Sequence, residues 1–170
     1  MTRLIKKPLD PSSMGVDTGT WAFLRTAGYC EYLKTAGDET GNVFGILPVE
    51  ALLEYGNLNK RSGILPVGLW VNYRVGTADL DAAPTMTLIA ESTRAQATPV
   101  ATSLSLTAET LPAAQGSYEK YASCKGSEGL VPILFAGDIL VVNLAFNTAG
   151  TSVLGIRKFL LEYKEISMDC

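Results

Sequence analysis

Hydrophobic and polar positions alternate along several short stretches of this chain, and turn-forming residues separate the stretches. Residues 69–75 place Leu, Val, Tyr and Val on one side and Trp, Asn and Arg on the other. Residues 85–93 and 103–109 repeat the alternation, with many Thr and Ser residues on the wetter side. Because successive side chains of a strand point to opposite faces, this period of two predicts half-buried β-strands.

The last third of the chain predicts two longer strands. Residues 139–146 alternate and end at a turn over 147–150, and residues 153–166 return. The returning strand is apolar on both faces near its end, with Phe159, Leu161 and Tyr163 on one face and Leu160 and Ile166 on the other. A strand of this kind must be covered on both sides, and at a sheet edge it would attract other chains. We therefore expect a neighbouring protein to supply part of the cover.

About eight short strands with turn signals between them predict an all-β protein. Only residues 49–55 show a pattern compatible with a helical turn, and no segment has the length of an amphipathic helix. The long connections at 49–66 and 110–129 favour a jelly-roll crossover over a simple meander. The expected fold is therefore an antiparallel β-sandwich of jelly-roll type.

The first 20 residues show no sustained periodicity and contain Pro8 and Pro11. We expect residues 1–20 to form an extended N-terminal arm and residues 21–170 to form a single jelly-roll domain. Two alternatives stay open for the arm: it is a loose terminus, or it lies on a neighbouring subunit. A chain of 170 residues is long enough to bury a core without metal or disulfide support.

Composition narrows the classes of function. Hydrophobic residues make up 47% of the chain and charged residues only 18%, so much of the surface is uncharged. Such a surface belongs to an assembly, or it consists of Ser, Thr and Ala in water. A net charge of −3 without a basic run argues against nucleic acid as a partner. No apolar stretch reaches the roughly 18 residues of a membrane span, and no secretion signal is recognisable, so we expect synthesis in a cytoplasm.

The chain contains no histidine, which removes catalytic triads, most catalytic zinc sites and most bases tuned near neutral pH. Enzymes built on carboxylates, Lys or Tyr stay possible. Cys30, Cys124 and Cys170 are widely spaced and odd in number, which favours free thiols over disulfides or a zinc site. We therefore predict no catalytic residue, no cofactor and no metal, and a protein that is not an enzyme.

Two acidic pairs, Asp79 with Asp81 and Asp38 with Glu39, are the compact groups of carboxylates. Carboxylate oxygens in loops bind hard cations. Asp is also a common turn residue, because its carboxylate accepts hydrogen bonds from nearby backbone amides. We prefer the turn interpretation, since catalysis would require two acids to converge at about 5 to 10 Å in a cleft.

Trp70 lies on the opposite side of its strand from Leu69, Val71 and Tyr73. If it is exposed, its ring can stack on a sugar or anchor another subunit. Alternatively, the strand is buried on both faces and Trp70 belongs to the core. The sequence leaves both interpretations open.

From about Trp21 to Tyr163 the chain resembles the single-domain jelly-roll structural proteins of bacteriophage virions. The shared features are a Pro-rich start, Trp21 in a first strand, Leu47-Pro48, Leu69-Trp70-Val71, Gly137-Asp138 before an apolar strand, and Leu154-Gly155-Ile156 before a final Tyr. The chain departs from that pattern at Ala145-Phe146-Asn147, which leads into an uncharged turn where the family has an Arg followed by an acidic turn. The resemblance implies assembly contacts and no catalytic residues.

The resulting hypothesis is a virion structural protein, made in the host cytoplasm, that serves as a minor capsid, decoration or coat subunit. Its expected partners are further copies of itself and other capsid proteins, with Trp21, Trp70, Phe159 and Tyr163 as core or interface anchors. The alternative is a carbohydrate-binding β-sandwich module, for example one for host attachment. A third candidate, a carboxylate-based hydrolase, requires paired acids in a pocket.

Overall fold

The computed structural model describes residues 3–25, 30–34, 37–53, 62–92, 100–106, 110–125 and 131–167. Within these ranges the chain forms twelve β-strands, and all pairings between them are antiparallel. The helical elements of the described residues are two 3-10 turns, η1 (Pro11–Ser13) and η2 (Val49–Ala51). The predicted all-β antiparallel sandwich of jelly-roll type is confirmed. The helical turn expected at 49–55 is present in its first half, and residues 54 and 55 lie outside the described ranges.

One layer, which we call sheet A, has the strand order β9–β6–β12–β4–β3. These strands span, in the same order, Gly116–Lys125, Ser62–Gly76, Val153–Ser167, Cys30–Lys34 and Trp21–Arg25. Two further strands join this sheet: β1 (Arg3–Leu9) pairs with β12, and β10 (Leu134–Phe135) pairs with β6.

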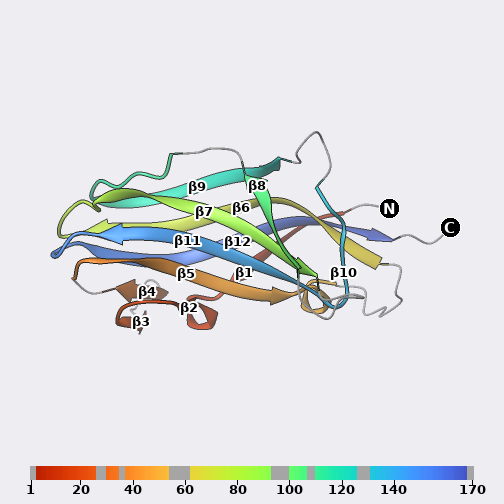
Figure 1. Cartoon of the computed structure of the whole chain (residues 1–170), viewed down its shortest axis with the longest axis horizontal. Coiled ribbons are helices and arrows are strands. Elements are labelled where there is room, and N and C mark those ends of the chain that lie inside the picture. The colour runs from red at the N-terminus through yellow and green to blue at the C-terminus, as the bar shows by residue number, and fades with distance from the viewer. Residues whose placement is uncertain are drawn as a thin grey trace.

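The second layer, sheet B, has the strand order β2–β5–β11–β7–β8. Its strands span Gly15–Val16, Glu39–Pro48, Asp138–Thr148, Ala82–Ser92 and Val100–Leu106. At one edge β8 also pairs with β9 over two residues, which connects the layers. Figure 1 shows β5, β11 and β7 of sheet B in front of β12 and β6 of sheet A.

The core fills the space between the layers. The largest contributions come from alternate residues of three long strands, all at most 1% exposed: Leu69, Val71 and Tyr73 of β6, Leu140, Val142 and Leu144 of β11, and Phe159, Leu161 and Tyr163 of β12. Burying one side chain of this size stabilises the fold by about 1.5 to 3 kcal/mol. The alternation that predicted these strands therefore also identified their inward faces.

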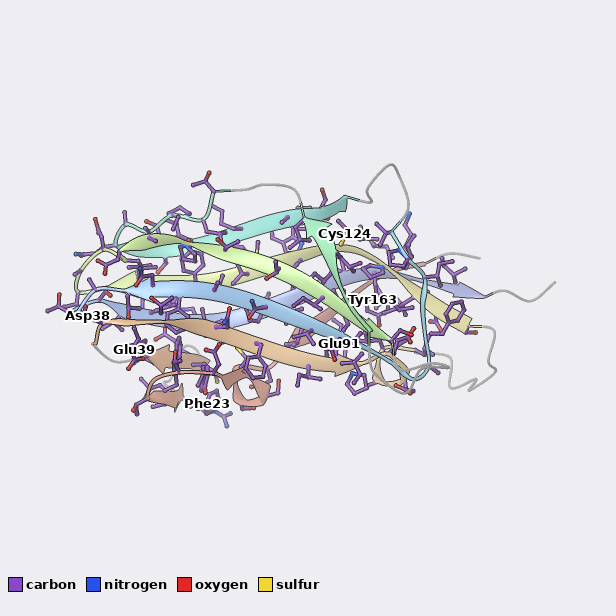
Figure 2. The ribbon with its side chains drawn as sticks, in the orientation of Figure 1. Phe23, Asp38, Glu39, Glu91, Cys124 and Tyr163 are labelled. Carbon is purple, nitrogen blue, oxygen red and sulfur yellow. The ribbon has the colours of Figure 1, made fainter. Side chains whose placement is uncertain are left out.

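Strand β12 lies inside sheet A and not at an edge. It pairs with β6 along its length, and its other side is shared by β4, which meets residues 154–156, and β1, which meets residues 159–165. Phe159 and Tyr163 are 0% and 1% exposed, so both are core residues of this chain, which is one of the two roles expected for them. The Tyr163 hydroxyl, labelled in Figure 2, donates a hydrogen bond to the Leu52 carbonyl at 2.6 Å. The chain thus pairs both edges of its own last strand and covers the inner face of that strand.

The first residues of the chain belong to the sandwich. Residues 3–9 form β1, whose Ile5 and Leu9 are buried, whereas Leu4 points outward and is 49% exposed. The element η1 and strand β2 follow before residue 20. Contacts of an arm with a neighbouring subunit, and a domain boundary at residue 20, stay predictions.

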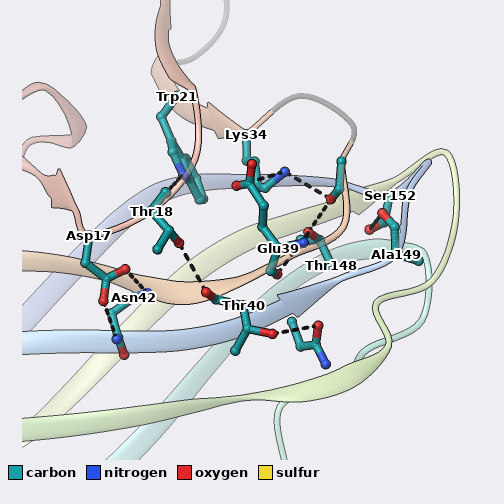
Figure 3. Close-up of polar contacts among 12 residues, drawn as sticks. Asp17, Thr18, Trp21, Lys34, Glu39, Thr40, Asn42, Thr148, Ala149 and Ser152 are labelled. Atoms are coloured by element: carbon teal, nitrogen blue, oxygen red, sulfur yellow. Dashed lines mark hydrogen bonds and ion pairs between the residues drawn. The ribbon is translucent and has the colours of Figure 1, made fainter.

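The antiparallel pair of β3 and β4 closes one side of the sandwich, and Figure 3 shows polar contacts made there. The Trp21 ring stacks on Tyr32 at a centroid distance of 5.1 Å and meets the edge of Phe146 of sheet B at 5.3 Å. On β4, the Lys34 ammonium lies 3.1 Å from the Gly37 carbonyl and 3.4 Å from a Glu39 carboxylate oxygen. Trp21 therefore connects the two sheets, as a core anchor would.

Within the described part of the chain, no helix is long and apolar enough to cross a membrane.

Candidate functional site

The outer face of sheet A carries a pair of aromatic rings. Trp70 of β6 is in register with Tyr121 of β9 on one side and with Leu160 of β12 on the other. The two ring centroids lie 4.7 Å apart with their planes inclined by 39°. Both side chains are half-buried, so part of each ring faces solvent. Rings at this distance attract one another and form a firm apolar surface.

The Glu162 carboxylate holds the two rings in place. It accepts a hydrogen bond from Trp70 Nε1 at 3.0 Å and forms an ion pair with Lys6 Nζ at 2.7 Å. The same Lys6 ammonium lies 5.7 Å from the centroid of the Trp70 ring, in cation–π range. Trp70, Tyr121, Glu162 and Lys6 together form what we call the aromatic platform.

Ionisation states follow from these contacts. Burial raises the pKa of Glu162. Hydrogen bonds from Lys6, Trp70 and Tyr121 together lower it by more than burial raises it, so the pKa lies below its ordinary value. Glu162 is therefore charged at neutral pH. Burial first, and then the hydrogen bond to Glu162, raises the pKa of Tyr121 to about 12, so its hydroxyl stays protonated.

A glycine provides the space in which Tyr121 sits. A Cβ at Gly68, two residues before Trp70 on the same face, would collide with the Tyr121 hydroxyl and ring. Only a residue without a side chain lets the phenol lie flat across β6 at this point.

A polar row and a basic row continue along β6 from the platform. Asn72 is in register with Glu119 of β9 and Lys158 of β12, and its side-chain oxygen is buried with no hydrogen-bond partner. Two residues further, Arg74 begins the basic row. The three rows span about 13 Å along the strand, at roughly 3.3 Å per residue.

The basic row is built around one buried carboxylate. Arg74 donates to both oxygens of Glu31, at 3.1 and 2.9 Å, and Arg157 Nε lies 3.5 Å from the first of them. The Glu31 side chain is 1% exposed, and it lies over Gly155, where a Cβ would collide with it. The register of β12 shifts between Ile156 and Lys158, so Arg157 and Lys158 both turn outward.

The outer face of sheet B is chemically different. Its strands β5, β11, β7 and β8 contain neither Trp nor Tyr, and neither Lys nor Arg. At one end Asn143 donates to the Asn42 and Thr87 side chains, at 3.1 and 3.2 Å. At the other end Ile46 is 56% exposed. This face therefore offers amides, hydroxyls, aliphatic groups and the half-buried ring of Phe44, which lies against Gly15, but no indole or phenol.

The two tryptophans singled out from the sequence lie in different parts of the sandwich. Trp70 lies on the outer face and not in the core between the sheets, while Trp21 lies at the side of the sandwich, far from it in the strand order. Whether either contacts a partner stays a prediction. Sequence reasoning missed Tyr121, Glu162 and Lys6. Tyr121 lies within 110–129, which was expected to be a long connection but contains β9, and the register of β9 against β6 brings it beside Trp70.

The acidic pairs are not brought together in a cleft. The Asp79 carboxylate accepts a hydrogen bond from the Gln115 backbone amide at 2.9 Å, and Asp38 and Asp81 are exposed. Glu39 pairs with Lys34. Among the described residues, no three potential ligands gather into a metal site. These contacts agree with the turn interpretation.

Cys30 and Cys124 are free thiols, and Cys170 lies outside the described ranges. Burial raises the pKa of Cys124 to about 11, so this thiol is protonated and unreactive near neutral pH.

No family model matches the sequence, and neither does any curated protein. Solved structures of similar fold do match. The CBM36-1 domain of a multidomain xylanase from the hindgut metagenome of Trinervitermes trinervoides has a TM-score of 0.48 at 9% identity, over 92% of this chain and 96% of that one. The xylan-binding module CBM86 from Roseburia intestinalis has a TM-score of 0.43 at 12% identity, over 94% and 96%. The CBM22-1 xylan-binding domain of Paenibacillus barcinonensis Xyn10C has a TM-score of 0.44 at 10% identity, over 94% and 85%.

These neighbours correct the expectation of a virion structural protein. The three matched structures are carbohydrate-binding modules and not phage proteins, and they give no support to capsid partners or a homo-oligomer. At 9 to 12% identity the likeness concerns the fold. A jelly-roll pattern of alternating strands and turns is shared by proteins of many functions, which is why the pattern misled.

Proposed function

We propose that this chain is a carbohydrate-binding module that binds a polysaccharide on the outer face of sheet A without cleaving it. The observation that carries the proposal is the aromatic platform. A sugar ring has an apolar face of C–H groups and a rim of hydroxyls, so it is recognised by an aromatic surface with polar groups beside it. Trp70 and Tyr121 supply the surface, and the Asn72 row supplies the polar groups.

Preorganisation supports the same proposal. Glu162 fixes the indole through a 3.0 Å hydrogen bond, so little conformational freedom is lost when a ligand binds. Two of the strands beneath, β6 and β12, are central in sheet A and hold the rows at fixed spacing.

Binding without turnover is part of the proposal. The chain has no histidine to act as an acid or base near neutral pH. On the face itself, Glu31 and Glu162 are engaged by cations and carry side-chain exposures of 1% and 8%, which suits a structural use. A reducing-end assay on any polysaccharide that binds should therefore show no release of new ends.

Affinity electrophoresis against a panel of soluble polysaccharides tests the proposal. The unsubstituted chain should be retarded by at least one of them, and Trp70→Ala should abolish the retardation. Phe23→Ala is the matched control, because Phe23 is an aromatic residue 42% exposed on β3 and remote from the platform. Thermal unfolding of each variant shows whether it is folded.

A second readout uses fluorescence. In Trp21→Phe the indole of Trp70 is the remaining one of the two in the chain, so a ligand that stacks on it should shift its emission. Binding that leaves the emission unchanged and survives Trp70→Ala would place the site elsewhere and refute the proposal.

A further inference from the structure

The two faces of the sandwich differ in charge as well as in aromatic content. Strands β2, β5, β11, β7 and β8 of sheet B contain no Lys or Arg. The outer face of sheet A carries five cations among the described residues: Lys6 and Lys164 near the ring pair, and Arg74, Arg157 and Lys158 further along. This asymmetry arises in a chain whose net charge is −3. On a protein of net negative charge, a positive face of this kind suits the binding of a negatively charged ligand.

The carboxylates of this face do not cancel its positive character at the surface. Glu31 lies beneath two guanidiniums, and Glu162 lies beneath Lys6. Their side chains are 1% and 8% exposed, whereas Lys6 and Arg74 are 53% and 30% exposed. Glu119 is the exposed carboxylate of the three rows. A ligand lying on β6 therefore meets ammonium and guanidinium groups beside the rings.

The order of the rows suits a ligand that has both an apolar sugar face and negative charge. The ring pair lies at one end, Asn72 and Lys158 lie one step along, and Arg74 with Arg157 lies at the far end. A chain that stacks a sugar on Trp70 brings its next units over Lys158 and the guanidiniums. The Arg74 fork is already engaged by Glu31, but two guanidiniums share that one carboxylate, so with Lys158 this end of the face keeps a net positive charge that attracts carboxylates.

We propose that the polysaccharide bound on this face is acidic, a glycan whose sugar units carry carboxylate groups. This inference rests on the proposed function and adds the class of ligand. The rings provide stacking that every sugar can use, and the basic row selects chains with uronic acid carboxylates. Neutral glycans of the same backbone bind the platform more weakly, because they leave the basic row in water.

Pairs of polysaccharides that share a backbone and differ in charge test the inference. The probes are polygalacturonate with its methyl-esterified form, and glucuronoxylan with its carboxyl-reduced form. In isothermal titration calorimetry at low salt, the acidic member of at least one pair should bind about fivefold or more tightly than the neutral member. Added salt should reduce that preference, since exposed charges are screened.

Variants locate the effect. Lys158→Gln should weaken binding of the acidic member by about twofold to fivefold, the range of an exposed ion pair, and leave the neutral member unchanged. Lys7→Gln makes the same change on the opposite side of β1 from Lys6 and should alter neither. Equal loss in both variants would indicate general attraction to a polyanion and overturn the inference.

The outcomes separate the two proposals. If acidic and neutral members bind equally and Trp70→Ala removes both, the proposed function holds and the acidic preference is wrong. If no member of either pair binds, and the wider panel is not retarded either, both proposals fall. A charge preference that survives Trp70→Ala would place the acidic site away from the platform and likewise overturn the inference.

Discussion

Glu162 shows how one residue sets the geometry of a surface. Its carboxylate, 8% exposed, accepts from the indole of Trp70 and pairs with Lys6, so the charged form belongs to the folded state. We expect Glu162→Gln to destabilise the protein at pH 7 by about 1.5 to 3 kcal/mol, the usual range for hydrogen bonds to a charged group. Urea unfolding followed by circular dichroism measures this difference.

The pH dependence of the Glu162 effect has a definite sign. Because the folded-state pKa lies below the ordinary value of 4.5, the carboxylate contributes its full stability above pH 4.5 and loses it as pH falls through the folded pKa. The gap between the unsubstituted chain and Glu162→Gln should therefore narrow on acidification. Glu119→Gln, an exposed carboxylate on the same face, is the control. A gap independent of pH would show that the charge of Glu162 does not matter.

A second prediction concerns the buried hydroxyl of Tyr163. Tyr163→Phe removes the donor to the Leu52 carbonyl and leaves that acceptor unsatisfied in the core. We expect a loss of about 1 to 3 kcal/mol in the free energy of unfolding. Tyr118→Phe makes the same change at a hydroxyl whose bond to the Ala114 carbonyl is exposed, so water replaces it and the loss should be small. Similar losses in both variants would contradict the assignment of Tyr163 to a dry interior.

At the scale of the strands, alternation predicted the elements that face water on one side. Strand β6 was recognisable because apolar residues alternate with Trp70, Asn72 and Arg74, and β11 because large apolar residues recur at every second position from 140 to 146. Strand β1 was not, because Lys6, Lys7 and Pro8 interrupt the pattern. Pro8 is tolerated because it lies on a strand that pairs on one side with β12, where an amide can point outward.

The candidate site was less predictable than the strands that carry it. Trp70 was identified as a residue that could stack on a sugar, but its partners come from β9, β12 and β1. A shift of register by one residue would turn each partner to the other face. Register depends on packing between distant segments, and so does the bulge that turns Arg157 outward. A single sequence specifies neither directly.

Strand β1 offers a test of whether the first residues belong to the fold. Ile5 is 7% exposed and Leu4 is 49% exposed, although they are neighbours on the same strand. Ile5→Ala should reduce the free energy of unfolding by about 2 to 5 kcal/mol, as for other core aliphatics, whereas Leu4→Ala should change it by less than about 0.5 kcal/mol. Urea unfolding of both variants checks this. A small effect of Ile5→Ala would show that β1 is a loosely attached arm.

For the whole molecule, the contacts indicate that the two sheets unfold together. The first strand, β1, pairs with the last strand, β12, and β12 carries core residues that face sheet B. The β3–β4 pair also contacts both layers, because Trp21 packs on Tyr32 of sheet A and on Phe146 of sheet B. Opening either sheet would expose the apolar face of the other, so a half-folded state should be sparsely populated.

The two tryptophans turn that expectation into a measurement. Trp21→Phe leaves Trp70 to report on the outer face of sheet A, and Trp70→Phe leaves Trp21 to report on the contact between the β3–β4 pair and sheet B. In each variant, urea transitions followed by fluorescence and by circular dichroism should coincide, with a slope of about 1 to 3 kcal/mol per molar urea. Comparing two probes within one variant removes the effect of each substitution on stability. An earlier fluorescence transition in Trp70→Phe alone would mean that the β3–β4 pair opens before the sandwich, and that Trp21 covers the core without joining its two layers.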